Sequence, residues 1–316
     1  MKNRLPRGAK ALALSLGMLA GAAFAAPLAY VPNEASGTIS VIDTGTDQVI
    51  KTIKAGKKPR GLAAVGDTLY VSDQPNNALL VIDLKQNEVV GTIDLGESPE
   101  GVGASADGKW VVVASEIANG VTFIDAATGK PVFNVKTKGE NPEHAVFSPD
   151  GKWLYVSAEE ADQVDIVDVA ARKQVKSVQV AKRPRGIAFL PDGSRAYVAC
   201  EFASKVFAID VATQEVVAEI QAGVFSNGVT VHPSGKRVYI SNGKDATVSV
   251  IDTASNQVIA TIPVGKRPWN MAITPDGSKL YVASGRSHAV SVIDTHTNQK
   301  IKDIPVGELP WGVLVH

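Results

Sequence analysis

A repeat of about 42 residues runs through most of the chain and limits its fold more than any other feature. Each copy carries an aspartate that directly follows Ile or Val. This marker occurs seven times, with gaps of 40, 42, 43, 42, 42 and 42 residues, at Asp43, Asp83, Asp125, Asp168, Asp210, Asp252 and Asp294. Such a period is typical of architectures whose units bury their faces only against neighbouring units. The sequence therefore predicts seven copies of one small structural unit.

The copy that spans residues 267–294, together with the segment after it, shows how each unit folds. Four short runs rich in apolar and β-branched residues are separated by turn signals, at 272–274, 280–283, 289–293 and 300–306. The first turn is Pro275-Asp276-Gly277, in which Pro presets φ and Gly accepts a positive φ. Short strands at this even spacing are typical of all-β folds. Seven units of four strands predict a seven-bladed β-propeller.

The two ends of the repeat array predict that the ring is closed. All six tyrosines occupy the same place in a second strand, and Val112 is the seventh member of this set: Tyr30, Tyr70, Tyr155, Tyr197, Tyr239 and Tyr281. The array begins in a second strand, Ala29 to Val31, and ends in a first strand, Trp311 to Val315. We expect these halves to form one four-stranded blade, because pairing the N-terminal strands with the C-terminal strand removes two free sheet edges.

The first 25 residues read as a secretory signal peptide. Lys2, Arg4, Arg7 and Lys10 precede an apolar run, and Ala23-Phe24-Ala25 is a small-x-small cleavage signal. The apolar run is short for a membrane span, and we therefore expect export to the periplasm without a membrane anchor. Residues 26–316 contain no linker or low-complexity tract, which predicts a single propeller domain.

Composition excludes several classes of function. Loss of the leader removes four of the 32 Lys and Arg residues and none of the 32 Asp and Glu residues, which leaves a formal charge of −4. An exported protein with this mild negative charge is not expected to bind nucleic acid. Cys200 is the only cysteine, so the chain cannot form an internal disulfide or a thiolate zinc site. We expect a monomer stabilised by packing and ring closure.

The repeat also resembles a known family. Each copy reads Pro-x-Gly-φ-Ala, Pro-Asp-Gly, Leu-Tyr-Val-Ser/Ala and Val-x-Val-Ile-Asp-x-x-Thr, where φ is apolar, and this pattern resembles the YVTN β-propeller repeat. With seven exported repeats, the chain is similar to the β-propeller proteins associated with pyrroloquinoline-quinone-dependent alcohol catabolism, some of which are tied to lanthanide use. The resemblance implies a periplasmic quinoprotein dehydrogenase or an ABC-transport component as partner. No catalytic motif carries this part of the resemblance, so it is an analogy.

Two sets of loops should open on one face of the propeller and hold a metal ion. The loops that enter the first strands and the loops that join the second and third strands carry five glutamates on three consecutive blades: Glu100, Glu116, Glu143, Glu159 and Glu201. Carboxylates gathered at one channel mouth repel one another unless a cation neutralises them. Oxygen ligands favour a hard cation, so we expect calcium or a lanthanide ion. The alternative is that these glutamates are solvated or paired with Arg60, Arg183 or Arg185.

The same mouth offers aromatic and cationic side chains for an organic cofactor. Trp269 and Trp311 occupy the position after the proline, and Arg60 and Arg185 occupy the same position in other blades. An aromatic platform flanked by guanidinium groups could stack on a flat polycarboxylate such as pyrroloquinoline quinone. The alternative is that the tryptophans form a hydrophobic plug over the channel. Trp110 and Trp153 begin second strands, where we expect them to pack between blades.

Three functions remain open from the sequence. The favoured one is a periplasmic accessory protein of pyrroloquinoline-quinone-dependent alcohol oxidation that binds a hard metal ion and performs no catalysis. The second is an interaction scaffold that docks a dehydrogenase or a transport component. The third is a propeller lactonase or lyase. For an enzyme, His144 is the one histidine placed near the channel, where it could act as a base.

Overall fold

The computed structural model describes Met1 and residues 26–316. Apart from Met1, the predicted signal peptide, residues 1–25, lies outside the described residues. Among the residues that are described, no helix has the length and hydropathy needed to cross a membrane.

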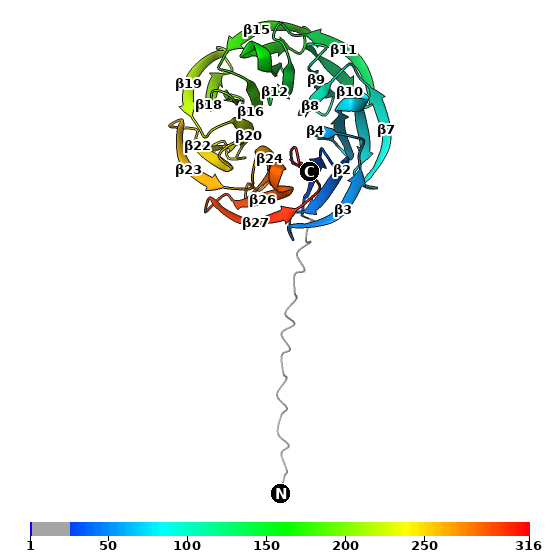
Figure 1. The fold of residues 1–316 in the computed structure, drawn as a ribbon, viewed down its shortest axis with the longest axis vertical. Helices are drawn as coiled ribbons and strands as arrows, with labels where there is room; N and C mark the ends of the chain where they lie inside the picture. Colours follow the sequence, from blue (N-terminus) through cyan, green and yellow to red (C-terminus); the bar gives the residue numbers. More distant parts are fainter. Residues whose placement is uncertain (2–25) are drawn as a thin grey trace.

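The described chain forms seven four-stranded antiparallel sheets arranged as a ring, as Figure 1 shows. We call these sheets blades and number them from the first complete one. Blade 1 contains β4 (Pro59–Val65), β5 (Thr68–Asp73), β6 (Ala78–Asp83) and β7 (Glu88–Asp94). Blade 2 contains β8 (Pro99–Ala104), β9 (Trp110–Ser115), β10 (Gly120–Asp125) and β11 (Lys130–Lys136). Blade 3 contains β12 (Pro142–Phe147), β13 (Trp153–Ala158), β14 (Gln163–Asp168) and β15 (Lys173–Gln179).

The other blades repeat this order. Blade 4 contains β16 (Pro184–Phe189), β17 (Arg195–Cys200), β18 (Lys205–Asp210) and β19 (Glu215–Gln221). Blade 5 contains β20 (Ser226–Val231), β21 (Arg237–Asn242), β22 (Thr247–Asp252) and β23 (Gln257–Pro263). Blade 6 contains β24 (Pro268–Ile273), β25 (Lys279–Ser284), β26 (Ala289–Asp294) and β27 (Gln299–Pro305). Blade 7 contains β28 (Leu314–Val315), β1 (Leu28–Asn33), β2 (Thr38–Asp43) and β3 (Gln48–Lys54).

Ring closure is confirmed in blade 7, where the two ends of the described array meet. β28 pairs antiparallel with β1, with Leu314 opposite Tyr30 and Val315 opposite Ala29. The seven-bladed, all-β fold class predicted from the repeat is therefore correct. This pairing covers the edge of β1 that would otherwise be open, and β28 takes the first-strand position of the blade.

The core lies between the blades. The second strands are buried along their length, and the tyrosine of each repeat has a relative exposure of 3% or less. Cys200 is also buried, and burial raises the pKa of its thiol to about 12. The fourth strands form the rim and are largely exposed, which fits their alternating polar and apolar residues.

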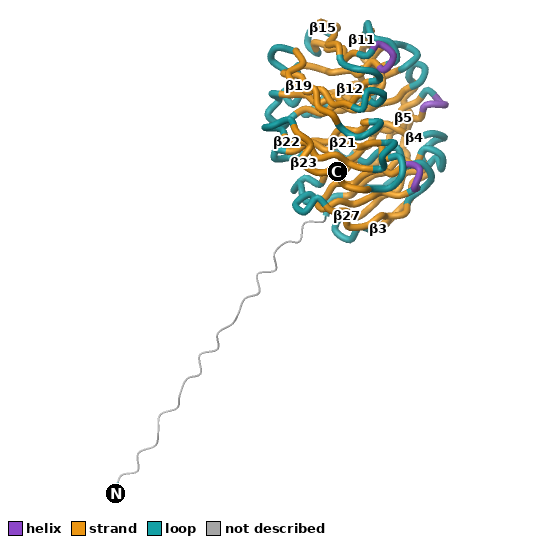
Figure 2. The backbone as a smooth tube through the Cα atoms, turned by 60° about the vertical axis from the view of Figure 1, so that its left-hand side comes forward, coloured by secondary structure: helices purple, strands orange, loops and turns teal. Residues whose placement is uncertain are grey.

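Loops on the two faces differ. The turns between first and second strands and between third and fourth strands occupy one face, which we call the turn face. The opposite face, which we call the mouth face, carries the loops that enter the first strands and those that join the second and third strands. Three of the joining loops in the described chain form short 3-10 turns, η1 (Gln74–Asn76), η2 (Glu159–Ala161) and η3 (Gly285–Ser287), which lie along one edge of the ring in Figure 2.

Candidate functional site

The Pro-x-Gly motif brings the first strands together around the axis of the ring. A Cβ on Gly61 would lie 2.2 Å from the carbonyl oxygen of Glu100, and one on Gly101 would lie 2.4 Å from that of Glu143. A side chain at these positions would therefore clash with the neighbouring first strand. The pairing of first and second strands shifts register between the proline and the position three residues on, as between Pro59 and Leu62. The residue after the proline lies within this irregularity at the mouth face.

Most of the predicted glutamates are held by arginines. Arg185 lies at ion-pair distance from three carboxylates: Glu143 at 2.9 Å, Glu201 at 3.4 Å, and Glu159. Arg183 contacts Glu159 and Glu201, each at 3.3 Å. Glu159 and Glu201 therefore belong to an arginine-centred cluster on blades 3 and 4.

Arg267, on the strand entry of blade 6, adds a third guanidinium to that cluster. Its Nη2 lies 2.6 Å from Glu201 Oε1. On the other side of the mouth, Arg60 lies 2.5 Å from Glu100 and 3.3 Å from Glu34. Four of the five predicted glutamates are therefore paired with an arginine, as in the alternative to a metal site.

Glu100, Glu116 and Glu143 form a carboxylate trio, which shares Glu143 with the cluster around Arg185. One oxygen from each lies within 4.8 Å of the other two. Glu116 has no ion-pair partner among the described residues, and it accepts hydrogen bonds from Ser98 Oγ at 2.8 Å and Gln74 Nε2 at 3.5 Å. Glu100 is 0% exposed, and within the described chain its Oε2 has no hydrogen-bond partner. A buried acceptor without a partner is costly, so this oxygen is suited to a ligand.

The trio carries more negative charge than its surroundings neutralise. Burial, with repulsion from Glu143, raises the pKa of Glu100 to about 8 although Arg60 favours its ionised form. Burial also raises the pKa of Glu116. Burial opposes ionisation of Glu143 as well, but the guanidinium groups of Arg185 and Arg60 help to hold the pKa of Glu143 below its usual range. At neutral pH a proton on Glu100 therefore reduces the charge of the trio.

A second group of polar side chains lies deeper, within the channel. His144 and Asn270 stand where most other blades have the glycine of Pro-x-Gly. His144 stacks on Trp311 of blade 7, with ring centroids 5.6 Å apart and planes at 11°. Both rings line a cavity of about 120 Å³ together with Asn270 and apolar side chains such as Leu62 and Ile187. Because blades 3 and 7 lie on opposite sides of the ring, this stack spans the channel.

His144 is a neutral, buried imidazole. Burial lowers its pKa, although the nearby Glu143 carboxylate and an interaction with the Asn270 side chain favour the charged form. Its Nδ1 has no hydrogen-bond partner in the part of the chain that the structure describes. A neutral imidazole with a free nitrogen facing a cavity can accept a proton or bind a polar ligand.

The residues predicted for an organic cofactor are dispersed. Arg60 and Arg185 are already paired with glutamates, and Trp311 packs on His144 in the channel. Trp269 lies at the mouth, with the Arg267 guanidinium 5.8 Å above its ring. A polycarboxylate would have to displace glutamates to reach these guanidinium groups, so the residues present do not fit pyrroloquinoline quinone.

Sequence reasoning missed several members of the site. Neither Arg267 nor Ser98, whose hydroxyl donates a hydrogen bond to Glu116, was predicted as a site residue. Asn270 was not predicted either, although it departs from Pro-x-Gly in the same way as His144. That shared departure is a signal that could have identified the channel group.

The fold and the charged mouth define a seven-bladed β-propeller with polar groups in its channel. A family model described as "Lactonase, 7-bladed beta-propeller" matches residues 144–305, just over half of the chain, so the chain belongs to this family. A second model, described as "YNCE-like beta-propeller", matches residues 28–147. No curated protein sequence matches the chain.

Two solved structures are similar in fold. Hydrazine synthase of Kuenenia stuttgartiensis has 21% sequence identity and a TM-score of 0.72, over 80% of this chain and 88% of that chain. A functionally unknown protein from Desulfotomaculum acetoxidans has 16% identity and a TM-score of 0.79, over 91% of this chain and 98% of that chain. At these identities the similarity concerns the fold alone.

Proposed function

We propose that this propeller binds a hard metal ion, calcium or a lanthanide, at its mouth face through Glu100, Glu116 and Glu143. The observation that carries the proposal is the buried Oε2 of Glu100, which has no partner in the described chain and lies within a trio of carboxylates. The trio supplies up to six oxygens, and water can complete the six to eight ligands that such ions take.

The proposal narrows the predicted ligand set from five glutamates to three. Glu159 and Glu201 each contact two or more of Arg183, Arg185 and Arg267, and neither belongs to the group of carboxylate oxygens that lie within 4.8 Å of one another. The proton held by Glu100 competes with the metal, so binding should release protons and become tighter as the pH rises toward 8.

Metal titration by calorimetry and thermal melting tests the proposal. Calcium and lanthanum chloride should each give saturable heat, and the Tm should rise with the logarithm of metal concentration above the Kd. Glu116→Gln should weaken binding at least about tenfold, because it removes one ligand charge without breaking an ion pair. Glu97→Gln, an exposed change in the loop that leads to Glu100, is the matched control and should bind normally. Absence of saturable heat for both ions would reject the proposal.

The biological role that we attach to the site is that of a periplasmic accessory protein in pyrroloquinoline-quinone-dependent alcohol oxidation. Support comes from the similarity of the repeats to that group of propellers and from the signal-peptide pattern. Its partner would be a quinoprotein dehydrogenase or an ABC-transport component. Cell fractionation tests the location, and the genes beside this one test the role. If metal binding fails, the protein is better explained as a scaffold for such a partner.

A second candidate function is lactone chemistry in the channel. Membership of the lactonase family and the free Nδ1 of His144 favour it. In this function the neutral imidazole would act as a general base, with Glu143 favouring its protonated form. Turnover of a panel of lactones by the unmodified protein, lost in His144→Asn, is the expected result. Absence of turnover on the panel by the unmodified protein removes this candidate.

A further inference from the structure

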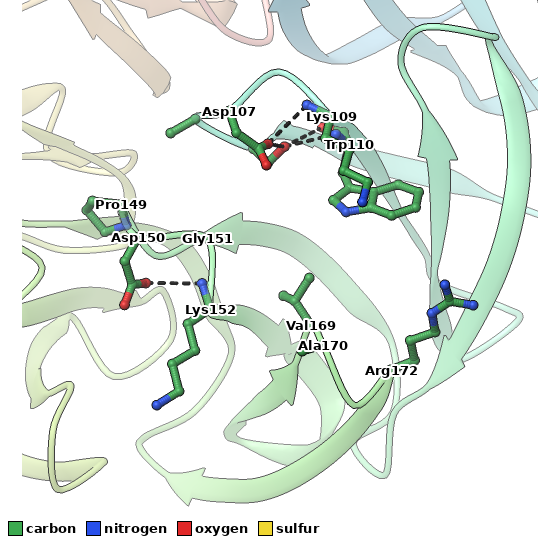
Figure 3. A pocket seen from close by; sticks show the side chains of 12 residues that line it. Asp107, Lys109, Trp110, Pro149, Asp150, Gly151, Lys152, Val169, Ala170 and Arg172 are labelled. Atoms are coloured by element: carbon green, nitrogen blue, oxygen red, sulfur yellow. Dashed lines mark hydrogen bonds between the residues drawn. The ribbon is translucent and has the colours of Figure 1, made fainter.

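The turn face carries a groove between blades 2 and 3 that the mouth-face site does not use. It holds about 560 Å³, a volume within the range of small-molecule sites. Figure 3 shows Trp110 and Lys109 on one side, Pro149 and Lys152 on another, and Val169 and Ala170 below. Arg172 lies at the far end.

Other blade boundaries show what normally occupies this place. In blades 4, 5 and 6 the second strand begins with a cation that reaches the turn of the next blade. Arg195 Nη1 donates to the carbonyl oxygen of Thr253 at 2.8 Å, and Arg237 Nη1 donates to that of Thr295 at 2.6 Å. Lys279 Nζ donates to the carbonyl oxygen of Thr44 at 2.8 Å. Blade 2 has Trp110 at this position.

In several blades the repeated tyrosine makes a second connection of the same kind, whereas the hydroxyls of Tyr155 and Tyr239 have no partner in the described chain. Tyr70 donates to the carbonyl oxygen of Ala126 in the next blade at 3.3 Å, and Tyr197 donates to Asn256 Oδ1 at 3.0 Å. Blade 2 has Val112 instead, which carries no hydroxyl. Among the seven boundaries of the described ring, only the one between blades 2 and 3 has neither the tyrosine nor the cation.

The Trp110 side chain contacts two aromatic rings of its own blade. The Trp110 ring lies 5.9 Å from that of Phe123 and 5.5 Å from that of Phe133, both edge-on. The equivalent boundary between blades 5 and 6 has a groove of about 310 Å³ that Arg237 lines, so the groove between blades 2 and 3 is a larger version of a space that Arg237 narrows there.

The chemistry of the groove favours an anion with a flat apolar body. Lys109, Lys152 and Arg172 are exposed cations on its walls. The Asp107 and Asp150 carboxylates are engaged by their own turns, because each accepts hydrogen bonds from a serine hydroxyl and from a backbone N–H. Trp110, Val169 and Ala170 supply the apolar surface on which a planar group can pack.

We infer that the groove between blades 2 and 3 is a binding site for a small planar carboxylate. The carboxylate is bound by Arg172 at the far end of the groove, and the planar body packs against Trp110 and the floor formed by Val169 and Ala170. A guanidinium can hold a carboxylate through two parallel hydrogen bonds, and aromatic contact orients the ring. This site is independent of the metal proposed at the mouth face.

Binding of 2-naphthoate, followed by the indole N–H signals of the 15N-labelled protein, tests the inference. The Trp110 signal should shift in a saturable way, and 2-naphthamide, which has the same shape without the charge, should bind at least about tenfold more weakly. Trp110→Phe assigns the signal.

Arg172→Gln should weaken binding about tenfold, because it removes an exposed charge and leaves the fold intact. Lys173→Gln, one residue further and not lining the groove, is the matched control. Trp110→Arg restores the cation of blades 4 to 6 and should weaken binding, because it narrows the groove and removes the aromatic surface. Absence of a saturable shift, equal binding of the amide, or unchanged binding by Arg172→Gln would each overturn the inference.

Discussion

The two halves of the mouth face differ although their backbones are equivalent. The residue that directly follows the Pro of Pro-x-Gly, or its equivalent, differs between the two halves. In blades 1 to 4 these residues form what we call the charged arc: Arg60, Glu100, Glu143 and Arg185. The same position in blades 5 to 7 forms the uncharged arc: Asn227, Trp269 and Trp311. In the charged arc, side chains are held by ion pairs that are largely withdrawn from solvent. In the uncharged arc, Trp311 is held by stacking and packing.

The repeat therefore determines where each of these residues lies in the ring, and its side chain determines whether it forms an ion pair or an aromatic contact. One ring of equivalent sites holds both buried electrostatic pairs and an aromatic contact across the channel. Function therefore has to be argued from the individual positions, since the fold is the same at all of them. The predictions below test how differently the two arcs respond to change.

Deletion of Leu309 to His316 should have the largest effect. It removes β28 and the buried Trp311 and Val313 from the uncharged arc and reopens the edge of β1. Truncation of a buried tryptophan alone costs about 3–5 kcal/mol. Since each kcal/mol shifts the Tm of a large domain by about 2–4 °C, the deletion should lower it by at least about 10 °C. Scanning calorimetry measures this, and an unchanged melt would contradict closure through β28.

Arg185→Gln should have the next largest effect, within the charged arc. It removes the guanidinium shared by Glu143, Glu159 and Glu201 and leaves buried carboxylates uncompensated. Breaking a buried ion pair from one side costs about 3–5 kcal/mol. Urea unfolding at neutral pH measures the loss. A loss no greater than that of an exposed arginine such as Arg172→Gln would show that the charged arc contributes little.

The pH dependence of stability isolates Glu100. In the folded protein its pKa is about 8, whereas an unfolded glutamate titrates near 4.3. Between these values the folded state holds the proton and the unfolded state does not, so this contribution to stability falls as the pH rises. In chelator-treated buffer, the metal-free protein should lose stability between about pH 5 and 8. Glu100→Gln should remove that part of the slope, and identical slopes would contradict it.

The ion pair between Lys85 and Asp67 should have the smallest effect. Its side chains are 73% and 65% exposed, and it lies outside both arcs. Exposed pairs are weakened by solvent and by the entropy of long side chains. Lys85→Ala should therefore leave the Tm unchanged within error in a thermal melt, which makes it the reference for Arg185→Gln. A drop comparable to that of Arg185→Gln would remove the distinction between buried and exposed pairs.

The fold was predictable because it depends on features that are local and repeated. Turn residues and a tyrosine at constant spacing identify each blade, and the position of the first and last strands identifies the closing one. Equivalent positions in neighbouring blades also had to lie near one another, which placed the glutamates at one mouth.

The grouping of those glutamates was not predictable in the same way. Whether Glu143 joins Glu116 or Arg185 depends on how far long side chains reach, and Arg267 reaches Glu201 from two blades away. The partition into a trio and an arginine-centred cluster needs coordinates.

The turn face was underestimated for a different reason. Its turns have nearly the same sequence in most blades, so no single turn stands out. The difference in blade 2 becomes visible only when Trp110 and Val112 are compared with the equivalent residues of the other blades. Trp110 was expected to pack between blades, and it does pack against the apolar cluster that joins blades 2 and 3, but it also contacts Phe123 of its own blade and lines a groove.

The boundary between blades 2 and 3 also determines how the ring responds to cold. Apolar clusters join the blades around the ring, and at several boundaries hydrogen bonds from Tyr70, Arg195 or Lys279 into the next blade add to them. At this boundary neither kind of residue is present, and the apolar cluster includes Phe123, Phe147 and Leu154. Hydrophobic contacts weaken on cooling. The ring should therefore loosen first at this seam near the freezing point, and amide hydrogen exchange in β9 should accelerate there relative to β17. A propeller of seven similar blades would in this way have one preferred place to open.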